Sequence, residues 1–129
     1  MSVLKKIFLI EADEGDQFFF KQALSQLKNA LLVGTAKNGK QALKMIHISK
    51  SLPDLIFLDI NMPVTNSVEF LKQQKLISTF KPIPIIVLAA SLLNCEILQM
   101  LGAKSCIEKP LYFDVWRDKI AEVINTDFK

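Results

Sequence analysis

The chain has 129 residues, of which 50% are hydrophobic and 22% are charged, and its formal net charge is +3. A chain of this length is expected to form one domain over residues 1–129, with a core over about 5–125. The 16 basic residues are scattered among 13 acidic ones without a run of like charges, so the composition favours no nucleic acid and no membrane as partner. The chain begins without a signal peptide, and no apolar stretch reaches the ~20 residues that cross a bilayer.

Two cysteines, Cys95 and Cys106, match no metal-binding or redox spacing. Cysteines in apolar stretches usually behave as small buried hydrophobic side chains, and we expect this of both. The default setting for such a chain is reducing and therefore cytoplasmic.

Five short apolar runs alternate with segments of helical spacing. Most of the runs are continuously apolar, which is the pattern of parallel strands that are covered on both faces. In chain order, strands and helices are expected in turn at 7–10, 16–28, 31–36, 40–49, 55–58, 67–77, 83–90, 93–101, 105–107 and 113–125. The fourth helix should end at Gly102, the usual residue for a left-handed cap. Strict alternation of strand and helix indicates an α/β fold with a doubly wound parallel sheet.

Charged side chains follow several of these strands. Asp59 comes directly after the third apolar run, Lys109 follows the fifth, and Glu11 and Asp13 follow the first. Because all strands of a parallel sheet end at one edge, where ligands bind, we expect these four residues and Ala89 to lie close together. Such a cluster suggests chemistry on a negatively charged group. Glu11 and Asp13 could equally serve as caps for the first helix.

Three features resemble the motifs of response-regulator receiver domains. They are the acids after the first strand, Asp59 with Asn61-Met-Pro two residues later, and Lys109 with the proline after it. This CheY-like module of two-component signalling would cover about residues 5–123. The resemblance implies a flavodoxin-like sheet of five strands in the order 2-1-3-4-5 with five helices. It also implies a stand-alone receiver that is not an enzyme, that accepts a phosphoryl group from a histidine kinase or phosphotransfer protein, and that acts by binding partners.

The resemblance assigns Asp59 as the phosphoacceptor and Lys109 as the contact to the phosphoryl oxygens. Glu11, Asp13, Asp59 and the backbone carbonyl of Asn61 would form the Mg²⁺ site. Ala12, however, stands where the family has its second acid. A carboxylate moved by one position along a strand end turns to the other face, and Mg²⁺ demands nearly octahedral oxygen ligands. The expected Mg²⁺ site is therefore weak or absent.

Further positions differ from the family pattern. Ala89 replaces a hydroxyl residue, Cys106 replaces the aromatic residue that reports phosphorylation, and Ser67 replaces a glycine. A hydrogen bond to a charged phosphoryl group is worth ~1.5–3 kcal/mol, whereas a full two-state switch takes about 5.5 kcal/mol. A degenerate pseudo-receiver that signals by protein contact alone is therefore the alternative. The fourth and fifth predicted helices carry apolar faces, which are core in most proteins. In receivers, however, a homodimer or another partner docks on the surface of helix 4, strand 5 and helix 5, so an exposed apolar patch there would mark an interface.

A remote alternative is a small phosphohydrolase of the haloacid-dehalogenase type, which also uses an Asp nucleophile, a Lys and Mg²⁺. That chemistry needs a second acid two residues beyond the nucleophile, where this chain has Asn61. A flavodoxin-like cofactor binder would need a phosphate-cradling loop after the first strand, where acids stand instead.

Overall fold

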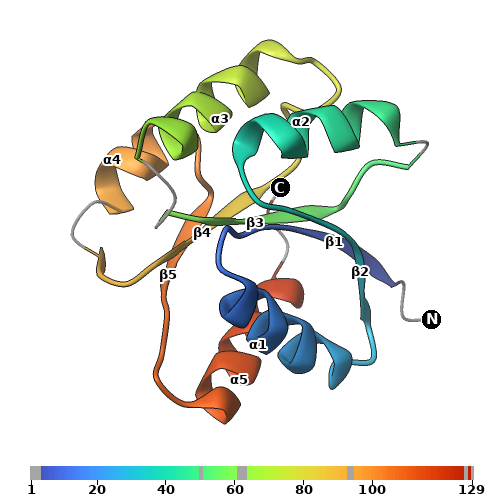
Figure 1. The fold of residues 1–129 in the computed structure, drawn as a ribbon, viewed down its shortest axis with the longest axis vertical. Helices are drawn as coiled ribbons and strands as arrows, with labels where there is room; N and C mark the ends of the chain where they lie inside the picture. The colour runs from blue at the N-terminus through green and yellow to red at the C-terminus, as the bar shows by residue number, and fades with distance from the viewer. Residues whose placement is uncertain (1–3, 50, 61–63, 93–94, 127, 129) are drawn as a thin grey trace.

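A computed structural model of the chain shows strands and helices in strict alternation (Figure 1). The structure describes residues 4–49, 51–60, 64–92, 95–126 and 128. The elements are β1 Lys5–Ile10, α1 Glu14–Ser25, β2 Ala30–Ala36, α2 Gly39–Ile48, β3 Leu55–Asp59, α3 Val64–Leu76, β4 Ile85–Ala89, α4 Cys95–Met100, β5 Ser105–Glu108 and α5 Phe113–Ile124. Their bounds differ from the predicted ones by at most three residues at either end.

The strands form one sheet in the order β2-β1-β3-β4-β5, and every neighbouring pair is parallel. The predicted doubly wound α/β fold with order 2-1-3-4-5 is therefore confirmed. Helices α1 and α5 cover one face of the sheet, and α2, α3 and α4 cover the other (Figure 1). The strand order reverses at β1 and β3, and the carboxyl ends of these two central strands mark the switch point at which such sheets bind ligands.

The core has two layers, one on each face of the sheet. In β3, Leu55 and Phe57 face the α1 and α5 layer, whereas Ile56 and Leu58 face the other helices. The ring of Phe57 packs edge to face on Phe20 of α1, with ring centroids 5.0 Å apart. Both faces of the strand need apolar side chains, which explains the continuous apolar runs in the sequence. In the described part of the chain, no helix combines the length and apolarity that spanning a bilayer requires.

The first helix begins two residues earlier than predicted. Asp13 is its N-cap, and the carboxylate of Asp13 accepts a hydrogen bond of 2.8 Å from the backbone amide of Asp16. Side-chain oxygens at this position satisfy amides that the first helical turn leaves without a partner. Of the two roles left open for Asp13, the structure shows the cap.

Helix α4 ends as predicted at Gly102, which has a φ of 123°. The amide of Gly102 donates to the carbonyl of Gln99, and the amide of Ala103 donates to that of Leu98. This pair of bonds is a Schellman motif, which needs a left-handed residue after the helix.

The two cysteines do not behave as predicted. Cys95 begins α4 and Cys106 lies in β5, and they form a disulfide with Cα atoms 5.8 Å apart. Both residues are partly exposed. The prediction of two small buried hydrophobic side chains is therefore wrong. It failed because α4 and the turn at Gly102 bring residues that lie 11 positions apart side by side.

A side chain at Gly34 should destabilise the folded protein. The register of β1 and β2 shifts between Ile7 and Phe8, which places Gly34 opposite Phe8. A Cβ atom at Gly34 would lie 2.6 Å from Cε2 of the buried Phe8 ring. We expect Gly34→Ala to lower the free energy of unfolding by about 1–3 kcal/mol, as overpacking does, in urea titrations. Val33→Ala, at an exposed side chain beside it, should cost less. Equal losses in the two variants would contradict this account.

Candidate functional site

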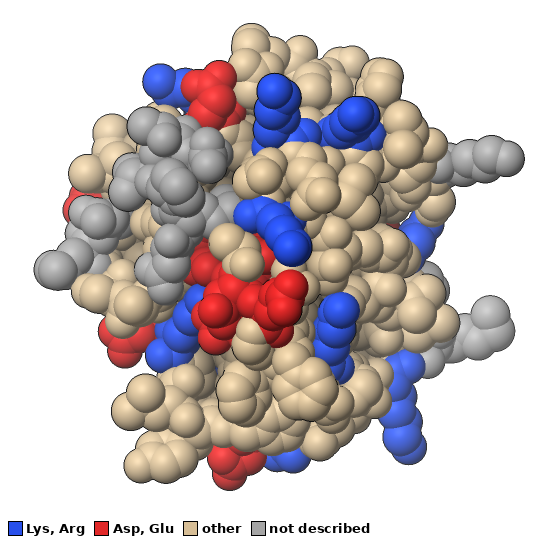
Figure 2. Space-filling model, in the orientation of Figure 1, with Lys and Arg blue, Asp and Glu red and all other residues tan. Residues whose placement is uncertain are grey.

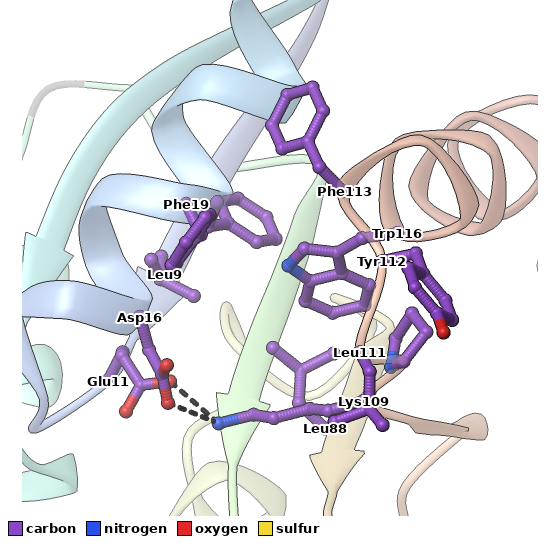
Figure 3. Close-up of a pocket in the computed structure, with 12 residues that line it drawn as sticks. Leu9, Glu11, Asp16, Phe19, Leu88, Lys109, Leu111, Tyr112, Phe113 and Trp116 are labelled. Carbon is purple, nitrogen blue, oxygen red and sulfur yellow. Dashed lines mark hydrogen bonds and ion pairs between the residues drawn. The ribbon is translucent and has the colours of Figure 1, made fainter.

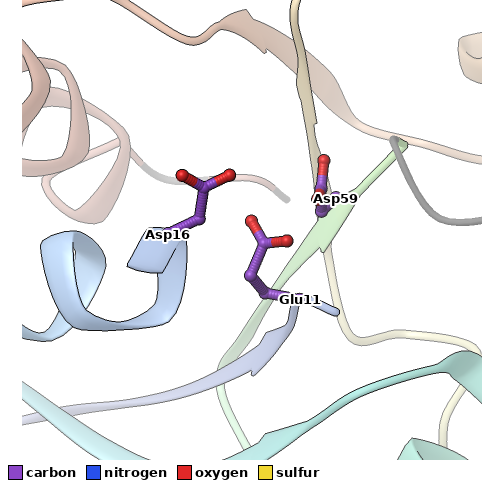
Figure 4. A group of neighbouring side chains, drawn as sticks. All are labelled: Glu11, Asp16 and Asp59. Carbon is purple, nitrogen blue, oxygen red and sulfur yellow. The ribbon is translucent and has the colours of Figure 1, made fainter. Parts of the chain in front are cut away.

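Four charged side chains meet at the carboxyl edge of the sheet. Glu11 follows β1, Asp59 ends β3 and Lys109 follows β5, while Asp16 lies in the first turn of α1. Glu11 and Asp59 are almost fully buried, with 2% and 1% of their surface exposed. Figure 4 shows the three carboxyl groups beside one another, with Glu11 and Asp59 at strand ends and Asp16 on the helix. The parallel sheet produces this meeting because its strands all end at the same edge.

The ammonium group of Lys109 is the centre of the cluster. Its Nζ lies 3.0 Å from Oε1 of Glu11, 3.0 Å from Oδ2 of Asp16 and 3.1 Å from Oδ1 of Asp59. The backbone amide of Lys109 donates a hydrogen bond of 2.8 Å to the carbonyl of Ala89, which holds the residue beside β4. The expectation that Asp59 and Lys109 lie together, although they are distant in the sequence, is thereby confirmed.

Asp16, and not the predicted Asp13, completes the acidic cluster. Glu11, Asp16 and Asp59 each offer a carboxylate oxygen, and these oxygens lie within 4.8 Å of one another. Asp13 is exposed, and its carboxylate is turned to the start of α1 as the cap. The acidic cluster thus contains Asp16 in the place where Asp13 was expected. The cap that removes Asp13 from the cluster also starts the helix early enough to put Asp16 in the first turn, facing the strand ends.

The close packing of these charges shifts two pKa values. Burial, together with the hydrogen bond to Asp59, raises the pKa of Glu11 to about 8, although Lys109 opposes this rise. For Lys109, burial lowers the pKa, but the hydrogen bond to Asp16 and the charges of Asp59 and Glu11 outweigh it and raise the pKa above its usual value. These shifts favour the charged form of Lys109 and make Glu11 easier to protonate near neutral pH than an ordinary glutamate.

The donor set of the cluster suits a hard divalent cation. Three carboxylates supply oxygen ligands, which Mg²⁺ prefers to nitrogen or sulfur. Figure 2 shows acidic side chains gathered near the middle of this face of the molecule, bordered by Lys and Arg side chains. The Mg²⁺ site was expected to be weak or absent because Ala12 stands where the family has an acid. Asp16 was not among the predicted ligands, yet its carboxylate lies in the cluster. Asn61, the expected carbonyl ligand, lies outside the described residues.

Two uncharged residues lie beside Asp59. Ala89 is buried at the end of β4 and brings no hydroxyl group to the cluster. Ser67, which is also buried, donates a hydrogen bond of 3.4 Å to the backbone carbonyl of Asp59. The Ser67 hydroxyl therefore ties the start of α3 to the end of β3.

An apolar cavity of about 200 Å³ adjoins the charged cluster. It lies between α1 and α5, with Phe19 and Trp116 among its walls and Lys109 at the end that faces Glu11 and Asp16 (Figure 3). The Lys109 side chain is only 17% exposed, so its ion pairs are less screened than pairs on the surface.

The chain matches a family model described as the response regulator receiver domain over residues 7–121. It is 32% identical over 103 residues to protein-glutamate methylesterase/protein-glutamine glutaminase 1 of Carboxydothermus hydrogenoformans, which covers 80% of this chain and 27% of that relative. It is 27% identical over 120 residues to sporulation initiation phosphotransferase F of Bacillus subtilis, which covers 93% of this chain and 94% of the relative. The chain thus spans about a quarter of the methylesterase but nearly all of the phosphotransferase.

Solved structures agree with this result. The phosphorylated cyanobacterial phytochrome response regulator RcpA superposes with a TM-score of 0.81 at 28% identity, over 94% of this chain and 91% of that one. The response regulator domain of Thermotoga maritima CheB superposes with a TM-score of 0.79 at 24% identity, over 96% and 98%, and supports the fold alone. Since the family model spans most of the chain and the sheet order agrees with these structures, the protein belongs to the response regulator receiver domain family of two-component signalling.

Proposed function

We propose that Asp59 accepts a phosphoryl group from a phosphohistidine on a histidine kinase or phosphotransfer protein. The observation that carries this proposal is the position of the Lys109 ammonium, 3.1 Å from Asp59 and 3.0 Å from two further carboxylates. Phosphoryl transfer needs mainly alignment and the neutralisation of oxygen charge, and a fixed cation beside a carboxylate supplies both.

In the transfer, a carboxylate oxygen of Asp59 forms a bond to phosphorus. The phosphorus–nitrogen bond to the donor histidine breaks, and the imidazole nitrogen keeps the electron pair. Lys109 is placed to exchange part of its contact with Glu11 and Asp16 for a contact with the phosphoryl oxygens. Glu11, Asp16 and Asp59 would hold Mg²⁺, which neutralises charge on the transferred group. The product is an acyl phosphate, and the domain acts by binding partners rather than by turning over a substrate.

The relatives support this role. One relative that aligns over 94% of its own length is named a phosphotransferase, and the RcpA structure at 28% identity is described as phosphorylated. The methylesterase relative aligns over only 27% of its length, so its esterase and glutaminase activities are not carried over to this chain. A histidine kinase or phosphotransfer protein as donor would place the protein in the cytoplasm.

Phosphorylation should depend on Asp59 alone. Treated with Mg²⁺ and a small phosphoryl donor such as phosphoramidate, the wild type should gain one phosphoryl group by intact mass, and Asp59→Asn should gain none. Asp118→Asn, which changes an exposed acid on α5, should behave as the wild type does. A wild type that neither gains the group nor shows beryllofluoride-induced shifts at Asp59 and Lys109 would leave the pseudo-receiver as the function.

The two neighbouring acids should differ in their effect on Mg²⁺. We expect Asp16→Asn to weaken Mg²⁺ binding roughly tenfold or more in calorimetric titrations, because a carboxylate ligand loses its charge. Asp13→Asn is the matched control, since asparagine caps a helix about as well as aspartate and Asp13 lies outside the cluster. Weaker binding in Asp13→Asn with unchanged binding in Asp16→Asn would restore Asp13 as the ligand.

The partner surface that we propose consists of α4, β5 and α5. Large apolar side chains are exposed on its two helices, with Ile97 59% and Met100 79% exposed on α4 and Val115 41% exposed on α5. A groove of about 380 Å³ runs between β5 and α5. Exposed apolar side chains beside a groove suit a protein partner or a second copy of the chain.

A further inference from the structure

The disulfide between Cys95 and Cys106 joins the first residue of a short helix to a strand at the edge of the sheet. The two Cα atoms are 5.8 Å apart, which is within the usual range for a disulfide. The bond can therefore form without moving the backbone of α4 or β5.

The bond is not needed to complete the core. Disulfides are usually structural in small secreted domains that cannot bury enough apolar surface. In this chain, both faces of the sheet are covered by buried apolar clusters. The cysteines lie at the side of one of these clusters, which Cys106 only partly joins. Because Cys95 lies in α4 and Cys106 in β5, the bond constrains the position of α4 relative to the sheet.

Helix α4 has few other anchors. It is six residues long, and isolated helices shorter than about 12–15 residues are marginal in water. Leu98 is its buried residue, whereas Ile97 and Met100 point to solvent. Among the described residues, Leu98 and Ala103 pack in the core, Leu101 packs against it, and the disulfide adds a covalent link from α4 to β5.

The bond is also within reach of small thiols. Both cysteines are partly exposed, and Cys106 lines the groove of about 380 Å³ between β5 and α5. Disulfides that solvent can reach tend to be the labile, regulatory or catalytic ones.

We propose that Cys95 and Cys106 are a reversible redox pair, whose oxidation fixes α4 against β5 and whose reduction releases it. In the reducing direction, the thiolate of a low-molecular-weight thiol such as glutathione attacks one sulfur of the pair and displaces the other as a thiolate. A second thiol molecule then displaces the first cysteine from the mixed disulfide, so that two protein thiols and one low-molecular-weight disulfide result. In the oxidising direction, a low-molecular-weight disulfide accepts the same two electrons and leaves as two thiols.

The proposal concerns the order of α4 and does not depend on phosphorylation of Asp59. The experiment uses the whole chain, equilibrated with mixtures of reduced and oxidised glutathione, blocked with an alkylating agent and weighed intact. We expect two alkyl groups per chain at reducing ratios and none at oxidising ratios. Hydrogen exchange of the amides in 95–103 should be roughly 10- to 100-fold faster in the reduced protein, and amides of α1 should not change.

The double variant Cys95→Ser/Cys106→Ser should take up no alkyl group and should exchange at one rate in both buffers. Asp59→Asn should respond to glutathione as the wild type does, which keeps this test separate from the proposed phosphorylation. Two free thiols at every glutathione ratio would overturn the proposal. A disulfide that forms while the exchange of α4 stays unchanged would overturn it as well.

Discussion

Replacing Lys109 by methionine should lower the free energy of unfolding by about 3–5 kcal/mol at pH 8 in the absence of divalent cations. The substitution removes the one cation that, among the described residues, pairs with all three carboxylates, two of which are almost fully buried. Removing one partner of a buried ion pair leaves an uncompensated charge, which costs more than the pair itself contributed. Urea titrations at fixed pH measure the change.

The loss in Lys109→Met should be smaller at pH 6, where Glu11 keeps its proton, and Mg²⁺ should recover part of it by binding the folded state. Lys104→Met, at an exposed residue just before β5, is the control and should cost little. A loss that is the same at both pH values and does not respond to Mg²⁺ would show that the ammonium does not balance the carboxylates.

Glu11→Gln should make the protein more stable than the wild type at pH 8.5 and about equally stable near pH 5. The pKa of Glu11 is about 8 in the folded protein against 4.5 for an ordinary glutamate side chain. Between these values the folded state binds more protons than the unfolded state, so the stability of the wild type falls as pH rises. The loss begins near pH 4.5, is complete above about pH 8 and amounts to a few kcal/mol.

Glutamine mimics the protonated carboxyl group and does not titrate, so the variant should lack this fall. Thermal or urea unfolding of both proteins from pH 5 to pH 9 measures the difference. Glu14→Gln is the control, because the Glu14 side chain is 83% exposed and outside the cluster. If the free energies of unfolding of the wild type and Glu11→Gln changed in parallel over this pH range, Glu11 would not be the source of the pH dependence.

The proton on Glu11 should also make Mg²⁺ binding depend on pH. Mg²⁺ binds ionised carboxylates, so a bound cation must displace the proton of Glu11. Apparent affinity for Mg²⁺ should therefore increase from pH 6 to pH 8. In Glu11→Gln, this increase should be weaker because the side chain at position 11 no longer carries a proton that the cation must displace.

The sequence was enough to predict that Glu11, Asp59 and Lys109 lie close together, because this prediction depends on only two conditions. The strands had to be parallel, which their continuous apolar runs indicated, and each residue had to follow a strand directly. The exact bounds of the strands did not matter, since an error of one or two residues still leaves these side chains at the same edge.

The role of Asp16 could not be predicted in the same way. Its position depends on where α1 begins, and that start depends on Asp13 capping the helix. The run of acids from Glu11 to Asp16 offered several caps and several ligands at once. A shift of one residue turns a helical side chain by about 100°, so the sequence alone did not separate ligand from cap.

The disulfide was missed for a different reason. The separation of 11 residues between Cys95 and Cys106 does not fix the distance between their Cα atoms. That distance follows from the short α4 and the left-handed Gly102 that returns the chain to β5. Pairing of cysteines is a tertiary property, and their spacing alone was uninformative.

The wall of the cavity beside Lys109 contains the only tryptophan of the chain, Trp116. Indole emission responds to nearby charge and to water, and this indole shares its cavity with Lys109, Glu11 and Asp16. The protein thus carries an intrinsic optical reporter at the edge of its acidic cluster. Events that displace the lysine can be followed by fluorescence in real time, without an added dye.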